Sequence, residues 1–249
     1  MRTTFAAVAA GLMLAGTAQA ADLYYGGPAP AGDPIYAPHS LVTGDVQLAA
    51  GFEEDDLRSY GGGRVNFALA SGWDLLVEAM GSTFAGGSFA GYGHLYYDHP
   101  SFSFGVFGGA GASSSGFYTL GVEAETAIGY GTKVGGRLGY IKPDLASGIT
   151  MGNLWLDYYF NAATRLKVQG AWYTTSGSDG WGLSGQLAHQ FNGSPVVGTL
   201  ELGVRDYASN SNVYGLVGAQ VMFDDPGTSL AQHDDNVRYQ IGYPLNYGF

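Results

Sequence analysis

Polar side chains of opposite or complementary type recur where antiparallel pairing would place them face to face. If residues 64–69 fold back on residues 73–78, Arg64 lies opposite Glu78. Three further hairpins place Glu123 opposite Arg137, Asp157 opposite Lys167 together with Tyr159 opposite Arg165, and Gln186 opposite Glu201. Such pairs can form ion pairs and hydrogen bonds or line a water-filled passage. Their chemistry is therefore pairing within the barrel wall or conduction of polar solutes.

The same four hairpins bring apolar residues together on the opposite face. Val65 meets Val77 and Val122 meets Leu138, and the same holds for Leu156 with Val168 and Leu187 with Leu200. A slip of one residue would turn every side chain to the wrong face, so registers that satisfy both faces are well specified. A sheet that is apolar outside and ionic inside is typical of a transmembrane β-barrel. The alternative is one face of an ordinary antiparallel sandwich.

We expect a barrel lumen lined by charged and amide side chains, six basic, six acidic and one amide. The predicted pore-lining residues are Arg64, Asp74, Glu78, Glu123, Glu125, Lys133, Arg137, Asp157, Arg165, Lys167, Gln186, Glu201 and Arg205. Barrels of about eight strands are filled by side chains, and those of about sixteen hold an aqueous channel. A narrow, polar, nearly charge-balanced pore is the first hypothesis. The alternative is that the ion pairs only hold the strands of the wall together and the lumen is blocked.

The predicted fold is an all-β, antiparallel up-and-down transmembrane barrel of about 12 strands. Connections after even-numbered strands are tight, and those after odd-numbered strands are mostly longer and more polar. Outer-membrane barrels place their short turns on the periplasmic side, so the start of the first strand and the end of the last strand should both face the periplasm. The expected strands are 45–52, 62–69, 73–83, 89–97, 102–110, 117–128, 132–141, 149–160, 164–173, 181–191, 196–206 and 213–223. In the fourth strand, the sequence does not decide whether Leu95 or the set Tyr92, His94 and Tyr96 faces outward.

Aromatic residues gather where the strands should leave the hydrocarbon, which indicates two interfacial girdles. One girdle would contain Trp73, Tyr97, Phe102, Phe160, Phe191 and Phe223, and the other Phe52, Phe84, Tyr140, Trp172 and Trp181. The alternative is that bulky rings simply favour strands.

The N-terminal segment, residues 1–20, is predicted to be a secretory signal peptide. Arg2 supplies the positive start, residues 5–16 the apolar stretch, and Ala18-Gln19-Ala20 the cleavage site. Residues 21–44 contain four prolines and are expected to form a periplasmic lead-in before the barrel, residues 45–223. A plug threaded into the barrel is the alternative for this lead-in.

The C-terminal residues 224–249 are harder to place. Aromatic and apolar residues alternate from Tyr239 to Phe249, as in outer-membrane assembly signals, but residues 218–223 form a similar ending. A thirteenth strand would leave the C-terminus outside the cell, and Pro244 cannot donate to a central ladder. We therefore expect closure at Phe223 and a periplasmic tail or assembly signal from Asp224, with a strand or a plug as alternatives.

Charge and composition exclude several classes of function. The chain carries a formal net charge of -11, and clustered basic surface for nucleic acid is lacking. Cysteine is absent, which excludes thiol chemistry and Cys-ligated metal. The mean hydropathy of +0.02 would suggest a soluble protein, but alternating strands average their hydropathy away.

Catalytic and cofactor sites are not expected. The five histidines are scattered, and the serines at 113–115 have no partnered histidine in the sequence pattern. Gly61-Gly62-Gly63 precedes a strand, so it is no phosphate cradle. The acidic run at 53–56 could bind calcium weakly, but a solvated acidic loop is the simpler interpretation. An outer-membrane lipase or protease is the remaining enzyme hypothesis.

Taken together, the export signal, the alternating strands, the aromatic girdles and the terminal Phe resemble Gram-negative outer-membrane β-barrel proteins of the broad porin-like class. The resemblance lies in the pattern across the mature chain. It implies an outer-membrane location, a barrel fold and a general role, and it indicates no substrate. The charged lumen predicts passive diffusion of small polar solutes or ions, and no cofactor is expected. The expected partners are outer-membrane lipid and the β-barrel assembly machinery, with a homo-oligomer possible. A non-conducting structural or surface-interaction barrel is the alternative.

Overall fold

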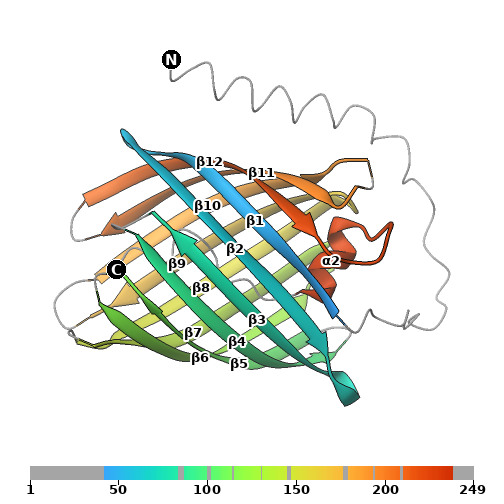
Figure 1. The fold of residues 1–249 in the computed structure, drawn as a ribbon, viewed down its shortest axis with the longest axis horizontal. Coiled ribbons are helices and arrows are strands. Elements are labelled where there is room, and N and C mark those ends of the chain that lie inside the picture. The colour runs from blue at the N-terminus through green and yellow to red at the C-terminus, as the bar shows by residue number, and fades with distance from the viewer. Residues whose placement is uncertain are drawn as a thin grey trace.

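The chain folds into a closed, antiparallel β-barrel (Figure 1). The computed structural model describes residues 42–83, 87–99, 102–113, 115–129, 131–144, 147–175, 179–192, 194–207 and 210–237. Twelve strands lie within them: β1 (Val42–Glu53), β2 (Asp56–Ala68), β3 (Trp73–Ser82), β4 (Ser88–His99), β5 (Phe102–Ala112), β6 (Gly116–Ala127), β7 (Thr132–Pro143), β8 (Ile149–Asn161), β9 (Thr164–Thr174), β10 (Asp179–Gln190), β11 (Val196–Tyr207) and β12 (Asn210–Met222). Each strand pairs with its neighbours in sequence, and β1 pairs with β12. The predicted fold class is confirmed.

All four predicted hairpin registers are confirmed. Arg64 lies opposite Glu78, and Val65 lies opposite Val77. The β6–β7, β8–β9 and β10–β11 pairs likewise place Glu123 opposite Arg137, Asp157 opposite Lys167, and Gln186 opposite Glu201. Because strand side chains alternate between two faces, each register fixes which residues point into the barrel.

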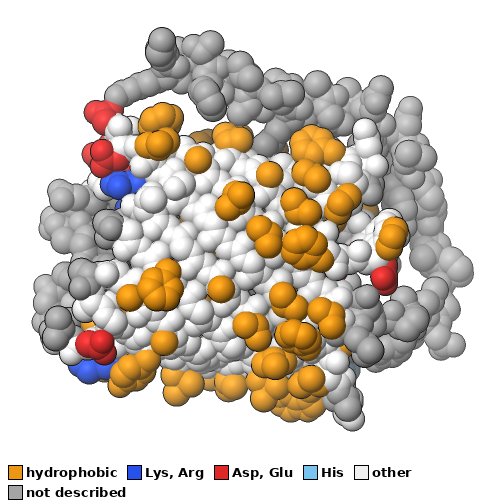
Figure 2. Space-filling view, viewed as in Figure 1, with side chains coloured by type: hydrophobic (Ala, Val, Ile, Leu, Met, Phe, Trp, Pro, Cys, Tyr) orange, Lys and Arg blue, Asp and Glu red, His pale blue; other side chains and the backbone are white. Residues whose placement is uncertain are grey.

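The outer wall is apolar and exposed. Leu120, Leu202 and Val213 are 66 %, 61 % and 67 % exposed, which would be costly across a whole surface in water. Figure 2 shows apolar side chains across the wall, with charged ones near the ends of the face that is visible. Among the described residues, no helix is long and apolar enough to cross a bilayer.

The aromatic residues predicted for two girdles lie mostly on this outer surface. Exposed rings near the tight-turn end include Trp73, Phe102, Phe160, Phe191 and Phe223, and those near the other end include Phe52, Tyr140, Trp172 and Trp181. Phe84 lies outside the described residues.

The fourth strand, whose facing the sequence left open, is set by its neighbours. Leu95 lies between Leu75 on β3 and Val106 on β5, and it faces outward with them. Tyr92, His94 and Tyr96 are consequently buried inside the barrel. Apolar partners on both adjacent strands therefore decide the orientation of a strand whose own residues do not.

The two ends of the barrel differ from the sequence prediction. β1 begins at Val42, inside the predicted lead-in, because residues 42–44 continue the ladder with residues 65–67 of β2. β12 ends at Met222, one residue before the predicted closure. The predicted signal peptide, most of the lead-in and residues 238–249 lie outside the described residues.

The segment after β12, for which we expected a periplasmic tail from Asp224, packs against the tight-turn end of the barrel in its described part. It turns back, and helix α2 (Leu230–Asn236) lies at the end of the barrel where β1 begins (Figure 1). The turn is stabilised by a capping box, in which the Ser229 hydroxyl accepts from Gln232 N and the Gln232 side chain accepts from Ser229 N. Leu230, His233 and Asp234 of the helix are buried, and its acidic side chains meet cations of the wall.

Candidate functional site

The interior of the barrel is divided into zones along the strands. Toward the tight turns the inward side chains are mostly charged, as with Arg64 on β2. Farther along the strands they are mostly aromatic or apolar, as with Tyr60 on the same strand. At the long-loop end, Glu53 and Arg205 restore charge. The interior is therefore ionic at both ends and aromatic between them.

The residues predicted to line a pore lie on the inner face. Those that are buried are Arg64, Glu78, Glu123, Glu125, Arg137, Asp157, Arg165 and Glu201, and those that are partly exposed are Asp74, Lys133, Lys167, Gln186 and Arg205. Their burial shows that the inner face is well covered, and their role in a pore stays a prediction.

Arg64 contacts a partner that sequence analysis missed. Its Nε donates to Asp45 Oδ2 at 2.9 Å, and its Nη1 donates to the carbonyl of Val237 at 3.4 Å. Asp45 is fully buried on β1, directly opposite Arg64. The signal was present, because Asp45 and Gln47 alternate with Val46 and Leu48 as inward polar positions do, but no β1–β2 register had been tested.

A second cluster surrounds His94. Its Nδ1 lies 2.8 Å from Glu123 Oε1, and its Nε2 lies 3.7 Å from Glu78 Oε2. The Arg137 guanidinium lies over two rings, 5.8 Å from the centroid of Phe107 and 5.3 Å from that of Trp155. Glu123 thus binds a histidine on β4 as well as lying opposite Arg137 on β7.

The Trp155 ring also holds a carboxylate in place, since its Nε1 donates to Glu125 Oε2 at 3.0 Å. The ring fits closely because Gly135 lies opposite it. A Cβ atom at Gly135 would lie 2.2 Å from Trp155 Cζ2.

Residues of β8 to β12 form a continuous polar network. Arg165 and Lys167 each approach Asp157 at 3.7 Å, and Arg165 Nη2 donates to Gln186 Oε1 at 2.9 Å. Gln186 Nε2 donates in turn to Glu201 Oε2 at 3.2 Å, and the Tyr214 hydroxyl donates to Glu201 Oε1 at 3.0 Å. This network runs across one wall of the lumen and balances its buried charges.

Helix α2 occupies the tight-turn mouth and is bonded to both sides of it. Asp234 Oδ2 accepts from Arg165 Nη1 at 2.7 Å and from the Tyr159 hydroxyl at 2.9 Å. Asp235 Oδ1 lies 2.5 Å from Lys133 Nζ. Lys133 on β7 and Arg165 and Lys167 on β9 outnumber Asp157, the acidic residue that strand pairing places beside them on β8. The carboxylates of α2 bind two of these basic side chains.

The start of α2 and its apolar residues fix its depth in the mouth. The backbone N–H of Leu230 donates to Gln190 Oε1 at 2.8 Å, and Gln190 Nε2 donates to the carbonyl of Thr228 at 2.9 Å. Leu230 and Val237 are buried, the latter with Leu76, Tyr96 and Trp155. Sequence analysis missed this helix, although Ser229 to Gln232 has the spacing of a capping box.

His233 joins the helix to β1 and to the preceding turn. Its Nε2 lies 2.9 Å from Asp45 Oδ2, and its Nδ1 lies 2.5 Å from Asp224 Oδ2. Burial alone would lower the pKa of His233, but the hydrogen bonds to Asp224 and Asp45 and the negative charges of Asp45 and Asp234 raise it to about 9. His233 is therefore a cation at neutral pH, and both ring nitrogens donate.

Asp234 remains ionised for the complementary reason. Burial would raise the pKa of Asp234, but the positive charges of Arg165, His233 and Lys133 lower it to about 2. The helix is thus attached by charged groups of both signs.

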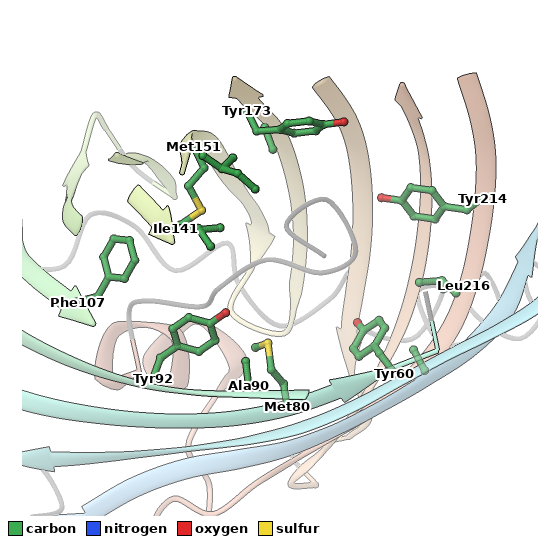
Figure 3. Close-up of a cluster of buried hydrophobic side chains, with 13 residues drawn as sticks. Tyr60, Met80, Ala90, Tyr92, Phe107, Ile141, Met151, Tyr173, Tyr214 and Leu216 are labelled. Atoms are coloured by element: carbon green, nitrogen blue, oxygen red, sulfur yellow. The ribbon is translucent and has the colours of Figure 1, made fainter. Parts of the chain in front are cut away.

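An aromatic and apolar band follows the ionic half. Figure 3 shows the side chains of Tyr60, Met80, Tyr92, Phe107, Ile141, Met151, Tyr173, Tyr214 and Leu216 directed from the strands into the interior. Small residues leave space for these rings, and a Cβ atom at Gly203 would lie 2.3 Å from Tyr214 Cζ. Sequence analysis did not separate this band from the ionic half.

The long-loop end carries a smaller ionic cluster. Glu53 accepts from Arg205 at 2.5 and 2.7 Å and from Arg58 Nε at 3.1 Å, and Arg58 also pairs with Asp56 at 2.9 Å. Two residues of the acidic run at 53–56, Glu53 and Asp56, are thus bound by arginines. In the described part of the chain, no group of three or more His, Asp or Glu side chains is arranged to hold a metal ion.

The fold is similar to those of solved outer-membrane channels. The KdgM porin matches with a TM-score of 0.54 at 16 % identity, over 72 % of this chain and 99 % of that one. The NanC porin matches with a TM-score of 0.58 at 11 % identity, over 71 % and 98 %. An outer-membrane channel from Pseudomonas putida matches with a TM-score of 0.56 at 10 % identity, over 79 % and 100 %. No protein-family model and no curated protein matches this chain in sequence.

Proposed function

We propose that the chain is an outer-membrane, porin-like channel for passive diffusion of small polar solutes or ions, with helix α2 seated in its periplasmic mouth. The observation that carries the proposal is the two-faced barrel, with Leu120 and Leu202 exposed on the outer wall while Arg64 and Glu78 are buried inside. Charged side chains inside a lipid-facing barrel favour a polar passage, because isolated ions in a dry interior are costly. The fold shared with solved porins supports the same function.

Location and partners belong to this proposal. The signal at residues 1–20 would export the chain to the outer membrane, where lipid would cover the apolar wall. The aromatic ending would engage the barrel assembly machinery. Small solutes would follow their own gradients, so the proposal requires no catalytic group and no cofactor.

Conductance across planar lipid bilayers tests the channel. The purified full-length protein should produce discrete, reproducible current steps. An Asp234→Asn variant, which loses the carboxylate bound by Arg165 and Tyr159, should produce larger or more frequent steps because α2 is less firmly attached. A lack of current from both proteins would contradict the proposal.

A non-conducting structural barrel is the second candidate. The observation that favours it is the close covering of the inner face, where Glu78, His94 and Glu201 are 2 % exposed or less. On this interpretation α2 and the ion pairs stabilise the wall and permit no flow. Permanent silence in bilayers, for protein whose gel mobility shifts on boiling as expected of a folded barrel, would favour this candidate.

A further inference from the structure

Acidic side chains outnumber basic ones inside the described part of the barrel. The acidic residues are twelve: Asp45, Glu53, Asp74, Glu78, Asp98, Glu123, Glu125, Asp157, Glu201, Asp224, Asp234 and Asp235. The basic residues are seven: Arg58, Arg64, Lys133, Arg137, Arg165, Lys167 and Arg205. If His94 and His233 are both protonated, the acids still exceed the bases. The sequence analysis, which balanced six against six, missed this excess because it did not include β1, Asp98 or the α2 segment.

Six of the seven basic side chains in the interior are held against carboxylates, and the seventh, Arg137, lies over the rings of Phe107 and Trp155. Arg64 binds Asp45, Arg165 binds Asp234, and Arg205 binds Glu53. The two lysines follow the same rule, since Lys133 binds Asp235 and Lys167 lies 3.7 Å from Asp157. A passing anion would therefore meet arginines and lysines whose charge is already compensated.

The excess of acid is concentrated at the tight-turn mouth. Asp74 on β3, Asp98 on β4 and Asp235 on α2 line one small cavity of about 40 Å³, together with the amides of Asn66 and Asn236. No lysine or arginine is among the residues that line it. This volume accommodates a small ion or a water molecule.

A neutral oxygen completes this cavity. Thr43 also lines it, and its Oγ1 is buried without a hydrogen-bond partner among the described residues. A buried hydroxyl without a partner is costly, and a cation or its bound water would satisfy it. The three carboxylates are not arranged to hold a metal ion, but carboxylate, amide and hydroxyl oxygens together attract a passing cation with its bound water.

The other zones also favour cations. The aromatic band presents Tyr60, Tyr92 and Tyr173, and ring faces attract cations and repel anions. At the long-loop mouth, Glu54 and Asp55 are exposed in the turn between β1 and β2. A potential of one sign along a low-dielectric passage concentrates the counter-ion.

We propose that the barrel passes small cations, of the alkali-metal and alkylammonium classes, in preference to anions. This inference rests on the proposed channel function and gives its solute class. Selectivity arises mainly at the tight-turn mouth, where Asp74, Asp98 and Asp235 face one cavity.

Reversal potentials test the inference. Currents are recorded with KCl at unequal concentrations on the two sides of a bilayer, because K⁺ and Cl⁻ diffuse at similar rates in water. The wild type should be several-fold more permeable to K⁺ than to Cl⁻. The double variant Asp74→Asn with Asp98→Asn should lower this ratio by about threefold or more, since it removes two mouth charges. Replacing KCl by tetramethylammonium chloride measures the alkylammonium class.

The control changes the same number of charges outside the passage. The double variant Asp144→Asn with Asp179→Asn removes two exposed carboxylates at the loop end and should change the ratio much less. Boiled and unboiled gel mobility establishes that each variant folds. Conducting channels that prefer Cl⁻, or a ratio unaffected by the mouth variant, would overturn the cation inference alone. Silence of the wild type and of Asp234→Asn would overturn the channel function and this inference with it.

Discussion

At the scale of single residues, buried charges often find partners on strands that are not adjacent. Glu123 on β6 binds His94 on β4, and Arg205 on β11 binds Glu53 on β1. Inward side chains converge on the concave face of a barrel, so groups two strands apart come within hydrogen-bond reach. Strand pairing therefore identifies which residues point inward but does not by itself assign their bonds.

The first residue-scale prediction concerns the carboxylate that attaches α2. Asp234→Asn should loosen the helix, because Arg165 is left buried beside a neutral amide, a loss on the order of 3 kcal/mol. The chain has no cysteine, so a spin label introduced through Ala231→Cys, a partly exposed position of α2 whose side chain is outside the capping box, is unique. Its mobility should increase in the Asp234→Asn background. The exposed Asp225→Asn serves as the control, and equal mobility in both backgrounds would contradict the assignment.

The second residue-scale prediction is a pH dependence of α2 docking. The folded-state pKa of His233 is about 9, above its ordinary 6.5, so its contribution is fully present below 6.5 and is lost as pH rises through about 9. The pKa of Asp234 is about 2, below its ordinary 3.8, so its contribution is present above 3.8 and is lost as pH falls through about 2. Docking should be firmest between these ranges.

The groups facing His233 are Asp45 and Gln220 on the wall and Asp224 on the turn, with Arg64 beside Asp45. The same spin label should become more mobile between about pH 7 and 9.5, for a loss of about 3 kcal/mol. His233→Gln should remove this alkaline transition. If the variant retains it, another group is responsible.

At the scale of elements, rings on one strand lie over glycines on the next. Trp155 on β8 covers Gly135 on β7, and Tyr214 on β12 covers Gly203 on β11. These contacts let large inward side chains lie along the wall of a narrow barrel. The abundance of glycine thus has a direct role in packing.

Substitution at Gly135 tests this packing. Gly135→Ala should lower the free energy of unfolding by about 1–3 kcal/mol, because the added Cβ would overlap the Trp155 ring and displace it from Glu125. Urea midpoints of the detergent-folded protein measure the change. Gly185→Ala is the matched control, since a Cβ there meets nothing within 4 Å. Equal midpoints for the two variants would contradict the proposed fit.

At the scale of the whole molecule, the wall separates an apolar outside from a charged inside, and α2 lies in the mouth at one end. The outer surface is suited to hydrocarbon, because the exposed Leu and Val side chains would be unfavourable in water. Inside, basic side chains are paired with carboxylates of the wall and of the helix, and acidic side chains are in excess. Insertion in a bilayer and attachment of α2 therefore depend on different residues.

Spin labels test the orientation of the wall. Labels introduced through Leu138→Cys and Leu202→Cys, which are 52 % and 61 % exposed, should collide readily with oxygen dissolved in lipid. A label through Thr199→Cys, whose side chain is buried on the inner face, should not. If a water-soluble nickel reagent reached the Leu138 and Leu202 labels better than oxygen did, the membrane orientation would be wrong.

By itself the sequence determined the closed antiparallel barrel, its strands and four of its registers. Side chains alternate between the two faces with a period of two, so a register error of one residue would turn every side chain to the wrong face. Only the tertiary structure decided the facing of β4, the partners of Asp45 and His94, and the return of α2 into the mouth. Those outcomes depend on contacts between segments far apart in the chain, such as Arg165 with Asp234, which no local periodicity records. They also decide the excess of acid inside the barrel, because the additional carboxylates come from β1, β4 and the α2 segment.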